Sequence, residues 1–368
     1  MKRFLPLLLA LCLILAGCGN PESEITDAAT TEPTTEPVTE APTTEPPATE
    51  PVTTPPVTEP EGVPSPLTGE LMPEASENRP FAVTINNIVD AMPQWGVSKA
   101  DILYEVLAEG GVTRSLAIFH DVEDVGPLGS IRSARPCMLD LAMAYDAIYV
   151  HAGGSQDAYS DLRSSGWDHI DGVQGANAYS YFYRDQDRLS MGYSLEHTLF
   201  ITGEDVVTYA RERGCDMTRT GGVNYGLCFA QDATPAGGTT AQTVTVDFAN
   251  SSKTTKFTYD AATGLYAAEQ YGRDYIDAGT GLQLTFRNLI VITADTSYDS
   301  DGYRLYYDLT DSGEGWFACG GKMVPILWSR TEKEEPFVYT LTDGTPLTLG
   351  VGTTYIAVTP YGSEMICE

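Results

Sequence analysis

The stretch "SARPCMLDLAMAYDAIYVHAGGSQDAYSDLRSSG", residues 133–166, predicts the fold class of the central part of the chain. Pro136 suits the first turn of a helix, where its missing N–H is not needed. The apolar run in "DAIYVHAGG" predicts a buried strand, and Ser155 then suits the N-cap of a second helix that ends at Gly166. Helix, strand and helix in succession indicate layers of α and β structure.

The flanking residues extend this alternation over 79–236. "FAVTINN" (81–87) and "TRSLAIFH" (113–120) predict strands. "SKADILYEVLAEGG" (98–111) predicts a helix, with Ser98 as N-cap and a Gly-Gly end. "TGEDVVTYARERG" (202–214) predicts another helix, which begins with a capping-box-like pair, Thr202 and Asp205. We therefore expect a layered α/β domain.

From about Thr243 the pattern changes to short alternating runs such as "TVTVDF", "KFTYD", "GLYAAEQ" and "TTYIAVTP", divided by turn residues. Several strands without intervening helices predict a mainly antiparallel β domain over 237–368. The expected fold class is therefore α/β (α+β), with an α/β domain followed by a mostly antiparallel β domain.

Residues 1–18 have the pattern of a lipoprotein signal peptide. Lys2 and Arg3 precede an apolar run, Phe4–Leu15, which is shorter than the ~20 residues that a membrane span needs. "LAGC" then resembles a bacterial lipobox, whose cysteine, here Cys18, is diacylated. We expect a lipid anchor on the extracytoplasmic face of the cell membrane; the alternative is an ordinary cleaved signal peptide.

Residues 19–78 predict a disordered linker rich in Thr, Pro and Glu, with 12 prolines and 12 threonines between Pro21 and Pro66. The chain from Arg79 onward carries 38 acidic and 19 basic residues. This balance argues against nucleic-acid binding by a basic patch and against electrostatic attachment to anionic lipid. The expected partners are the membrane, through the anchor, and a cell-wall component or surface protein.

Long motifs on both sides of residue 237 resemble the YerB-like lipoproteins of Gram-positive bacteria. "RPFAVTINN" and "GPLGSIRSARPCMLDLAMAYDAIYVHAGGS" resemble their N-terminal region, and "IDAGTGLQLTFRNLIV" and "GTTYIAVTP" their C-terminal region. The resemblance runs from about Arg79 to Pro360. It implies the two-part architecture and a surface location, but no reaction, because the family is one of unknown function. The chain departs from the expected pattern at Asn86 and beside His197.

The turn after residue 150 suggests a ligand site. Open α/β sheets bind ligands at the carboxyl ends of their strands, glycines allow close backbone approach, and helix N-termini attract anions. We expect an anionic group, peptide or wall glycan to contact some of Arg114, Arg132, Arg135, His151, Gly153, Gly154, Ser155 and His197. The alternative is that the glycines only turn the chain and the arginines pair with Glu105 or Glu109, which would share one face of the helix predicted over 98–111.

Catalysis is the second class of function. A cell-wall hydrolase or transferase could use an Arg/His/Ser site at the sheet edge, but Ser155 lacks the G-x-S-x-G context of a nucleophile elbow. No spacing of Cys or His suggests zinc, and no motif implies a cofactor. Cys137 is expected in the core, His197 is expected to be buried and hydrogen-bonded, and Cys215 could pair with Cys228. We favour a binding or interaction module.

Overall fold

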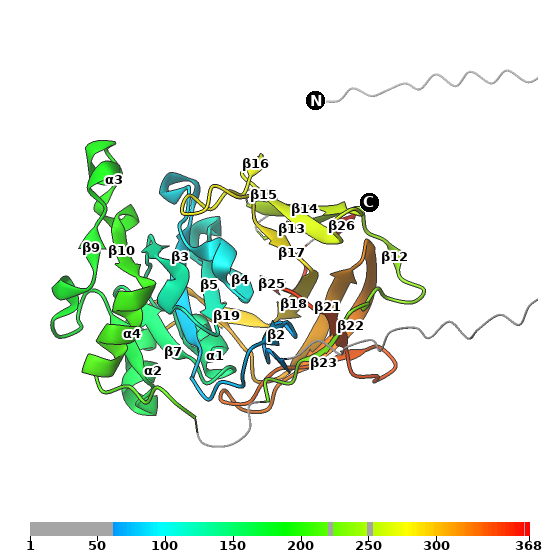
Figure 1. Ribbon diagram of the computed structural model, residues 1–368, viewed down its shortest axis with the longest axis horizontal. Helices are drawn as coiled ribbons and strands as arrows, with labels where there is room; N and C mark the ends of the chain where they lie inside the picture. The colour runs from blue at the N-terminus through cyan, green and yellow to red at the C-terminus, as the bar shows by residue number, and fades with distance from the viewer. Residues whose placement is uncertain (1–61, 220–223, 249–252, 364) are drawn as a thin grey trace, which may run out of the picture. The chain divides into compact units, whose positions relative to one another are not determined.

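The computed structural model describes residues 62–219, 224–248, 253–363 and 365–368 (Figure 1). The predicted signal peptide, Cys18 and most of the predicted linker lie outside the described residues. Within the described ranges, no helix combines the length and the apolar character that crossing a membrane requires.

The helices lie in the first half of the described chain, as expected for the α/β part. Pro136 begins α1, Ser155 caps α2 and Thr202 caps α4, each as predicted. The α-helices are α1 (Pro136–Met143), α2 (Gln156–Ser165), α3 (Gln186–Ser190) and α4 (Gly203–Glu212). The 3-10 helices are η1 (Val89–Ala91), η2 (Val97–Lys99), η3 (Glu109–Gly111), η4 (Glu123–Val125), η5 (Ala178–Ser180) and η6 (Leu195–His197).

One long sheet contains strands from both halves of the chain. Its path runs through β12 (Thr239–Thr240), β22 (Lys322–Ser329), β21 (Ser312–Cys319), β18 (Asn288–Ala294), β25 (Thr354–Pro360), β4 (Ile102–Leu107), β5 (Thr113–Phe119), β3 (Phe81–Asn87), β7 (Ile148–His151) and β8 (His169–Asp171), and β23 (Val338–Leu341) pairs with β22. The junction is β25, which lies parallel to both β18 and β4. The two expected domains therefore share one sheet, and they belong to one compact unit.

The prediction of a helix over residues 98–111 was wrong. Residues 102–107 form the central strand β4, and every one of its side chains is buried. Its neighbours, antiparallel β5 and parallel β25, satisfy the backbone of both edges. A strand paired on both edges and covered on both faces shows no alternation of apolar and solvent-facing side chains, so its pattern does not distinguish it from a buried helix; in β4 even Glu105 is buried. Ser98 is no cap of an α-helix; its hydroxyl donates to Asp277 Oδ2 at 2.7 Å.

A second sheet lies beside the C-terminal strands of the long sheet (Figure 1). Several of its strands alternate between buried and more exposed side chains, which is typical of an antiparallel sheet with one face toward solvent. It contains β16 (Arg273–Asp274), β15 (Leu265–Gln270), β14 (Thr254–Asp260), β13 (Thr243–Asp247) and β26 (Met365–Cys367), and β17 (Thr285–Phe286) pairs with β15. The predicted mixed fold, with mostly antiparallel sheets in the C-terminal part, is confirmed.

Smaller strand groups complete the fold. They are β6 (Pro127–Gly129), β10 (Leu199–Thr202) and β9 (Tyr183–Arg184) in one sheet, and the pairs β11 (Cys228–Ala230) with β24 (Thr348–Gly350), β19 (Thr296–Tyr298) with β20 (Leu305–Tyr307), and β1 (Val63–Pro64) with β2 (Leu71–Met72).

The first of these pairs along the chain corrects the predicted end of the linker. Residues 62–78 were assigned to it, but they include β1 and β2, and Leu67 is fully buried in the core. Gly69 has a left-handed φ of 71°, and its α-carbon packs on the ring of Phe229. The Pro- and Ser-rich composition around these residues concealed a segment that packs on the folded body.

Candidate functional site

The turn predicted as a ligand loop is held by hydrogen bonds within the protein. Gly153 has a left-handed φ of 74°, its N–H donates to Asp171 Oδ1 at 2.8 Å, and its carbonyl accepts from Ala134 N–H at 2.8 Å. The Ser155 hydroxyl caps α2, as expected. Gly154 lies so close to Ala134 that a Cβ at Gly154 would be 3.2 Å from the alanine Cβ. The turn joins β7 to α2 and fixes the position of His151.

His151 is fully buried behind this turn. Its Nδ1 lies 2.9 Å from the Gly153 carbonyl, and its Nε2 lies 2.9 Å from Nδ1 of His169. Burial lowers the pKa of His151 to about 4, so the ring is neutral at pH 7. The ring is bonded to these groups, and the Ser155 hydroxyl accepts from the N–H of Ala158 in α2; within the described residues no hydrogen bond joins Ser155 to His151.

Two of the predicted site arginines share one carboxylate. Arg114 Nη2 lies 2.8 Å from Glu109 Oε1, and Arg135 donates to both oxygens of the same group. Burial alone would raise the pKa of Glu109, but the hydrogen bonds and charges of the two arginines outweigh it and hold this pKa well below its usual range. Glu109 therefore provides the ion pairs that the alternative anticipated, whereas its predicted helical neighbour Glu105 lies in β4.

Arg132 belongs to another cluster. Its Nη1 lies 2.8 Å from Glu196 Oε2, and the other oxygen of Glu196 lies 3.6 Å from Nε2 of His197. The predicted site residues therefore fall into three groups: the His151 turn, the pair around Glu109, and Arg132 with His197. Of these groups, only the last contributes to the lining of a large cavity in the described residues, through His197.

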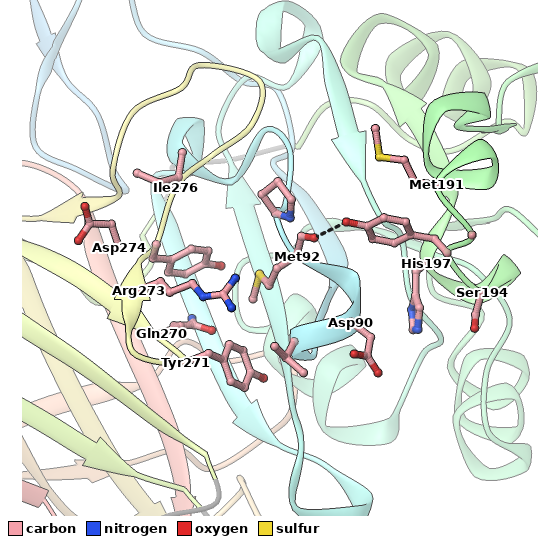
Figure 2. A pocket seen from close by; sticks show the side chains of 15 residues that line it. Asp90, Met92, Met191, Ser194, His197, Gln270, Tyr271, Arg273, Asp274 and Ile276 are labelled. Carbon is pink, nitrogen blue, oxygen red and sulfur yellow. Dashed lines mark hydrogen bonds between the residues drawn. The ribbon is translucent and has the colours of Figure 1, made fainter.

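That cavity is a cleft of about 630 Å³ (Figure 2). Three segments form it: residues 89–93 around η1, residues 191–197 before β10, and residues 270–276 around β16. Its lining residues are Val89, Asp90, Met92, Pro93, Met191, Gly192, Tyr193, Ser194, His197, Gln270, Tyr271, Arg273, Asp274, Tyr275 and Ile276. Both halves of the chain therefore contribute side chains to the cleft.

A buried arginine connects two of these segments. Arg188 Nη1 donates to the Ala91 carbonyl at 2.9 Å and to the His197 carbonyl at 3.0 Å. Its guanidinium lies 5.1 Å from the ring centroid of Tyr193, and the Tyr193 hydroxyl donates to the Met92 carbonyl at 2.9 Å, the bond drawn in Figure 2. These contacts fix the width of the cleft on this side.

His197 is buried and hydrogen-bonded, as predicted. Its Nδ1 lies 2.8 Å from the side-chain amide nitrogen of Asn86. An amide nitrogen can only donate, so Nδ1 is the acceptor and the neutral ring carries its hydrogen on Nε2. Burial lowers the pKa of His197 against the opposing effect of Glu196, which favours this neutral ring at pH 7. Asn86, one position at which the chain departs from the expected pattern, thus contacts the histidine beside the other departure.

The wall formed by residues 270–276 rests on a buried ion pair. Lys253 Nζ lies 2.8 Å from Glu105 Oε1, and each side chain is only 1% exposed. The same ammonium donates to Gln270 Oε1 at 3.0 Å and lies 4.7 Å from the ring centroid of Tyr271. The Tyr271 hydroxyl donates to the Asn87 carbonyl at 2.7 Å. The ion pair therefore fixes two lining residues.

Other lining groups are available to a ligand. Asp90, Arg273 and Asp274 are exposed, and their side chains form no hydrogen bond or salt bridge within the described ranges. Figure 2 shows the Arg273 guanidinium extending from one wall into the cleft. Sequence reasoning identified only His197 among the lining residues. The turn "QYGRDY" (270–275) was the available signal, because it combines aromatic and charged residues, but its partner segments are more than 70 residues away in sequence.

Family models match both parts of the chain. The model described as "Protein of unknown function (DUF3048) N-terminal domain" matches residues 67–216, and the corresponding C-terminal domain model matches residues 244–356. The chain belongs to the DUF3048 family. It is 31% identical over 302 residues to a Bacillus subtilis (strain 168) protein named "Putative lipoprotein YerB", covering 80% of this chain and 86% of that protein.

The DUF3048 fold is also seen in a solved structure. The crystal structure of the YerB protein from Bacillus subtilis matches with a TM-score of 0.70 and 28% identity, over 83% of this chain and 99% of that chain. The cleft of this DUF3048 protein takes residues 89–93 and 191–197 from the N-terminal match and residues 270–276 from the C-terminal match.

Proposed function

We propose that this DUF3048 protein is a lipid-anchored, extracytoplasmic binding protein that holds a wall glycan in the cleft. The lipobox-like "LAGC" and the B. subtilis relative's name, a lipoprotein, support the anchor. The Thr/Pro/Glu-rich segment that follows acts as a tether, which lets the folded body reach the wall.

We infer the ligand class from the combination of fixed aromatic rings and available polar groups in the lining of the cleft. Tyr193 and Tyr271 use their hydroxyls on backbone carbonyls, so their rings are held in place at the cleft. A sugar has apolar C–H faces and many hydroxyls, and it can pack on rings while its hydroxyls bond to Asp90, Arg273 and Asp274. Such an amphipathic lining is typical of small-ligand sites.

The charges favour this ligand over a small anion. Two carboxylates that have no partner within the described residues, Asp90 and Asp274, line the cleft together with one such guanidinium, that of Arg273. An anion would meet a surplus of negative charge, whereas a hydroxyl can donate to a carboxylate and accept from a guanidinium. A cleft lined in this way suits a neutral, hydroxyl-rich chain.

Calorimetric titration of the full chain in detergent micelles with soluble N-acetylglucosamine oligomers tests the ligand class. We expect saturable binding that Arg273→Ala weakens about tenfold, since a hydrogen bond to a charged group contributes about 1.5–3 kcal/mol. Lys256→Ala, which removes a charge from β14 outside the cleft, should leave the affinity unchanged. No saturable binding, or equal losses in both variants, would contradict the proposal.

The anchor has a separate test. Only the thiol of Cys18 can accept the diacylglycerol, so Cys18→Ala should abolish incorporation of radiolabelled palmitate. Palmitate incorporation at the wild-type level in this variant would show that the interpretation of "LAGC" as a lipobox is wrong, without affecting the glycan proposal.

A further inference from the structure

A second cavity, of about 420 Å³, lies in the N-terminal part of the chain. It is bordered by α2, β8 and the residue after α4, in the region where Figure 1 places α2 and α4 beside each other. Its polar lining includes Tyr159, Arg163, His169, Asp171 and Arg213. None of these residues lines the glycan cleft, so the two sites are distinct.

The backbone of the turn at residue 153 determines which nitrogen of His169 is free. A carbonyl oxygen can only accept, so His151 donates from Nδ1 to Gly153 and, being neutral, presents an unprotonated Nε2. That nitrogen must accept the hydrogen of His169 Nδ1, which lies 2.9 Å away. The neutral ring of His169 therefore carries its lone pair on Nε2, and no group in the described residues donates to that atom.

The acidic groups around this cavity are already occupied. Asp171 accepts from the N–H groups of Gly153 and Val173, both at 2.8 Å, and from the Tyr159 hydroxyl at 2.6 Å. Asp168, next to His169 in sequence, pairs with Arg79. The donors to Asp171 are neutral and stabilise its ionised form, so the lining carries one carboxylate against the two guanidiniums of Arg163 and Arg213, a surplus of one positive charge.

The cations, by contrast, have no such partners. The guanidiniums of Arg163 and Arg213 form no hydrogen bond or salt bridge in the part of the chain that the structure describes. Burial lowers the pKa of His169; the charge of Asp171 opposes this effect, and the charge of Arg213 adds to it. Among the described residues, these two guanidiniums thus line the cavity without ion-pair partners, although the chain from Arg79 onward has twice as many acidic as basic residues.

We propose that this cavity binds a phosphate group that carries a hydrogen, with Arg163 and Arg213 holding its oxygens and Nε2 of His169 accepting its hydrogen. Guanidiniums match the geometry and charge of phosphate oxygens. The acceptor selects phosphate from other tetrahedral anions, because a fully ionised sulfate has no hydrogen to donate and its oxygens repel the lone pair. Burial lowers the pKa of His169, which favours the neutral ring that this acceptor role requires.

Calorimetry of the full chain in detergent micelles at about pH 6 tests the site. Inorganic phosphate and glycerol phosphate are titrated in parallel, with sulfate at matched ionic strength as the control. We expect saturable binding of at least one phosphate compound, at least tenfold tighter than sulfate, and the tighter compound identifies a free phosphate or an ester as the natural ligand. Binding of neither compound, or equal binding of sulfate, would overturn the proposal.

Variants separate the roles of the residues. Arg213→Ala should weaken phosphate binding at least tenfold, while Arg211→Ala, which removes the same charge two residues away and outside the cavity, should change it less than twofold. His169→Asn retains a donor toward His151 but removes Nε2, so it should abolish the preference for phosphate over sulfate. Equal losses in both arginine variants, or an unchanged preference in His169→Asn, would refute it.

Discussion

Glu105 and Glu109 are four residues apart, but they belong to ion-pair clusters of different kinds. Glu105 bonds to Lys253, and its oxygens also accept from Asn87, Thr113, Thr255 and Tyr355, so its cluster joins both halves of the chain. Glu109 lies after β4 and binds two arginines of the N-terminal part. The first cluster is almost completely buried, whereas the Glu109 side chain is 15% exposed.

The two clusters differ in how far their charges are removed from water and in the number of basic residues that pair with each glutamate. In the Glu105 cluster a single ammonium balances the charge, and burial lowers the pKa of Lys253 more than Glu105 raises it. In the Glu109 cluster one carboxylate has two arginines, so losing one leaves the other. We therefore expect the first cluster to tolerate substitution far less than the second.

The largest expected effect is that of Lys253→Met. It leaves the Glu105 carboxylate buried without a counter-charge, which should reduce the free energy of unfolding by about 3–5 kcal/mol. Urea denaturation of the full chain measures it. Lys256→Met is the control, because Lys256 lies 3.7 Å from Glu269 in a pair whose side chains are 45% and 31% exposed, and such pairs contribute less than about 1 kcal/mol. Equal effects of the two variants would mean that burial gives the Lys253–Glu105 pair no larger contribution than an exposed pair makes.

Arg135→Ala should have an intermediate effect. It removes the hydrogen bonds of Arg135 to Glu109 but leaves Arg114 as a partner, so we expect a loss of about 2 kcal/mol in the same assay. Arg132→Ala should cost less than about 1 kcal/mol, because its partner Glu196 is 51% exposed. A loss of 3–5 kcal/mol for Arg135→Ala would place both clusters in the same class.

The last prediction concerns the loss of stability in acid that is due to Glu109. The folded pKa of Glu109 lies below its unfolded value, so its stabilisation is complete above an unfolded pKa of about 4.3 and is lost as the pH falls toward the folded value. Between pH 5 and pH 3.5 this residue should account for a loss of about 1 kcal/mol. Glu109→Gln should be less stable at pH 7 but show a correspondingly flatter decline. An unchanged slope would mean that Glu109 has no depressed pKa.

The sequence allowed prediction of those elements whose signals are local. Pro136, Ser155 and Thr202 each marked a helix start, and the β-branched content of residues 81–87 marked β3, because caps and short strands depend on neighbouring residues. It failed at β4. The parallel partner of β4 follows some 250 residues later, and nothing near Ile102 records that pairing.

The candidate sites, like the strands and helices, could be predicted only where the signal is local in sequence. His197 was predicted to be buried, but the cleft beside it needs residues 270–276, and no local pattern places these opposite one another. His169 was missed, although a signal existed: it follows a strand and a ten-residue helix, and in such a unit β7 and β8 lie side by side with His151 opposite Asp171. Cys215 and Cys228, whose pairing the sequence left open, are free thiols, while Cys137 is buried as expected.

The position of β25 determines the order in which this protein can fold. β25 is among the last strands of the chain, yet it lies between β18 and β4 in the middle of the long sheet. Until residue 360 has been synthesised, β4 presents an apolar strand with one open edge, a ready template for pairing with another chain. We therefore expect a chain shortened before residue 354 to aggregate. Because the β25–β4 contact joins residues far apart in sequence, we also expect the complete chain to fold slowly.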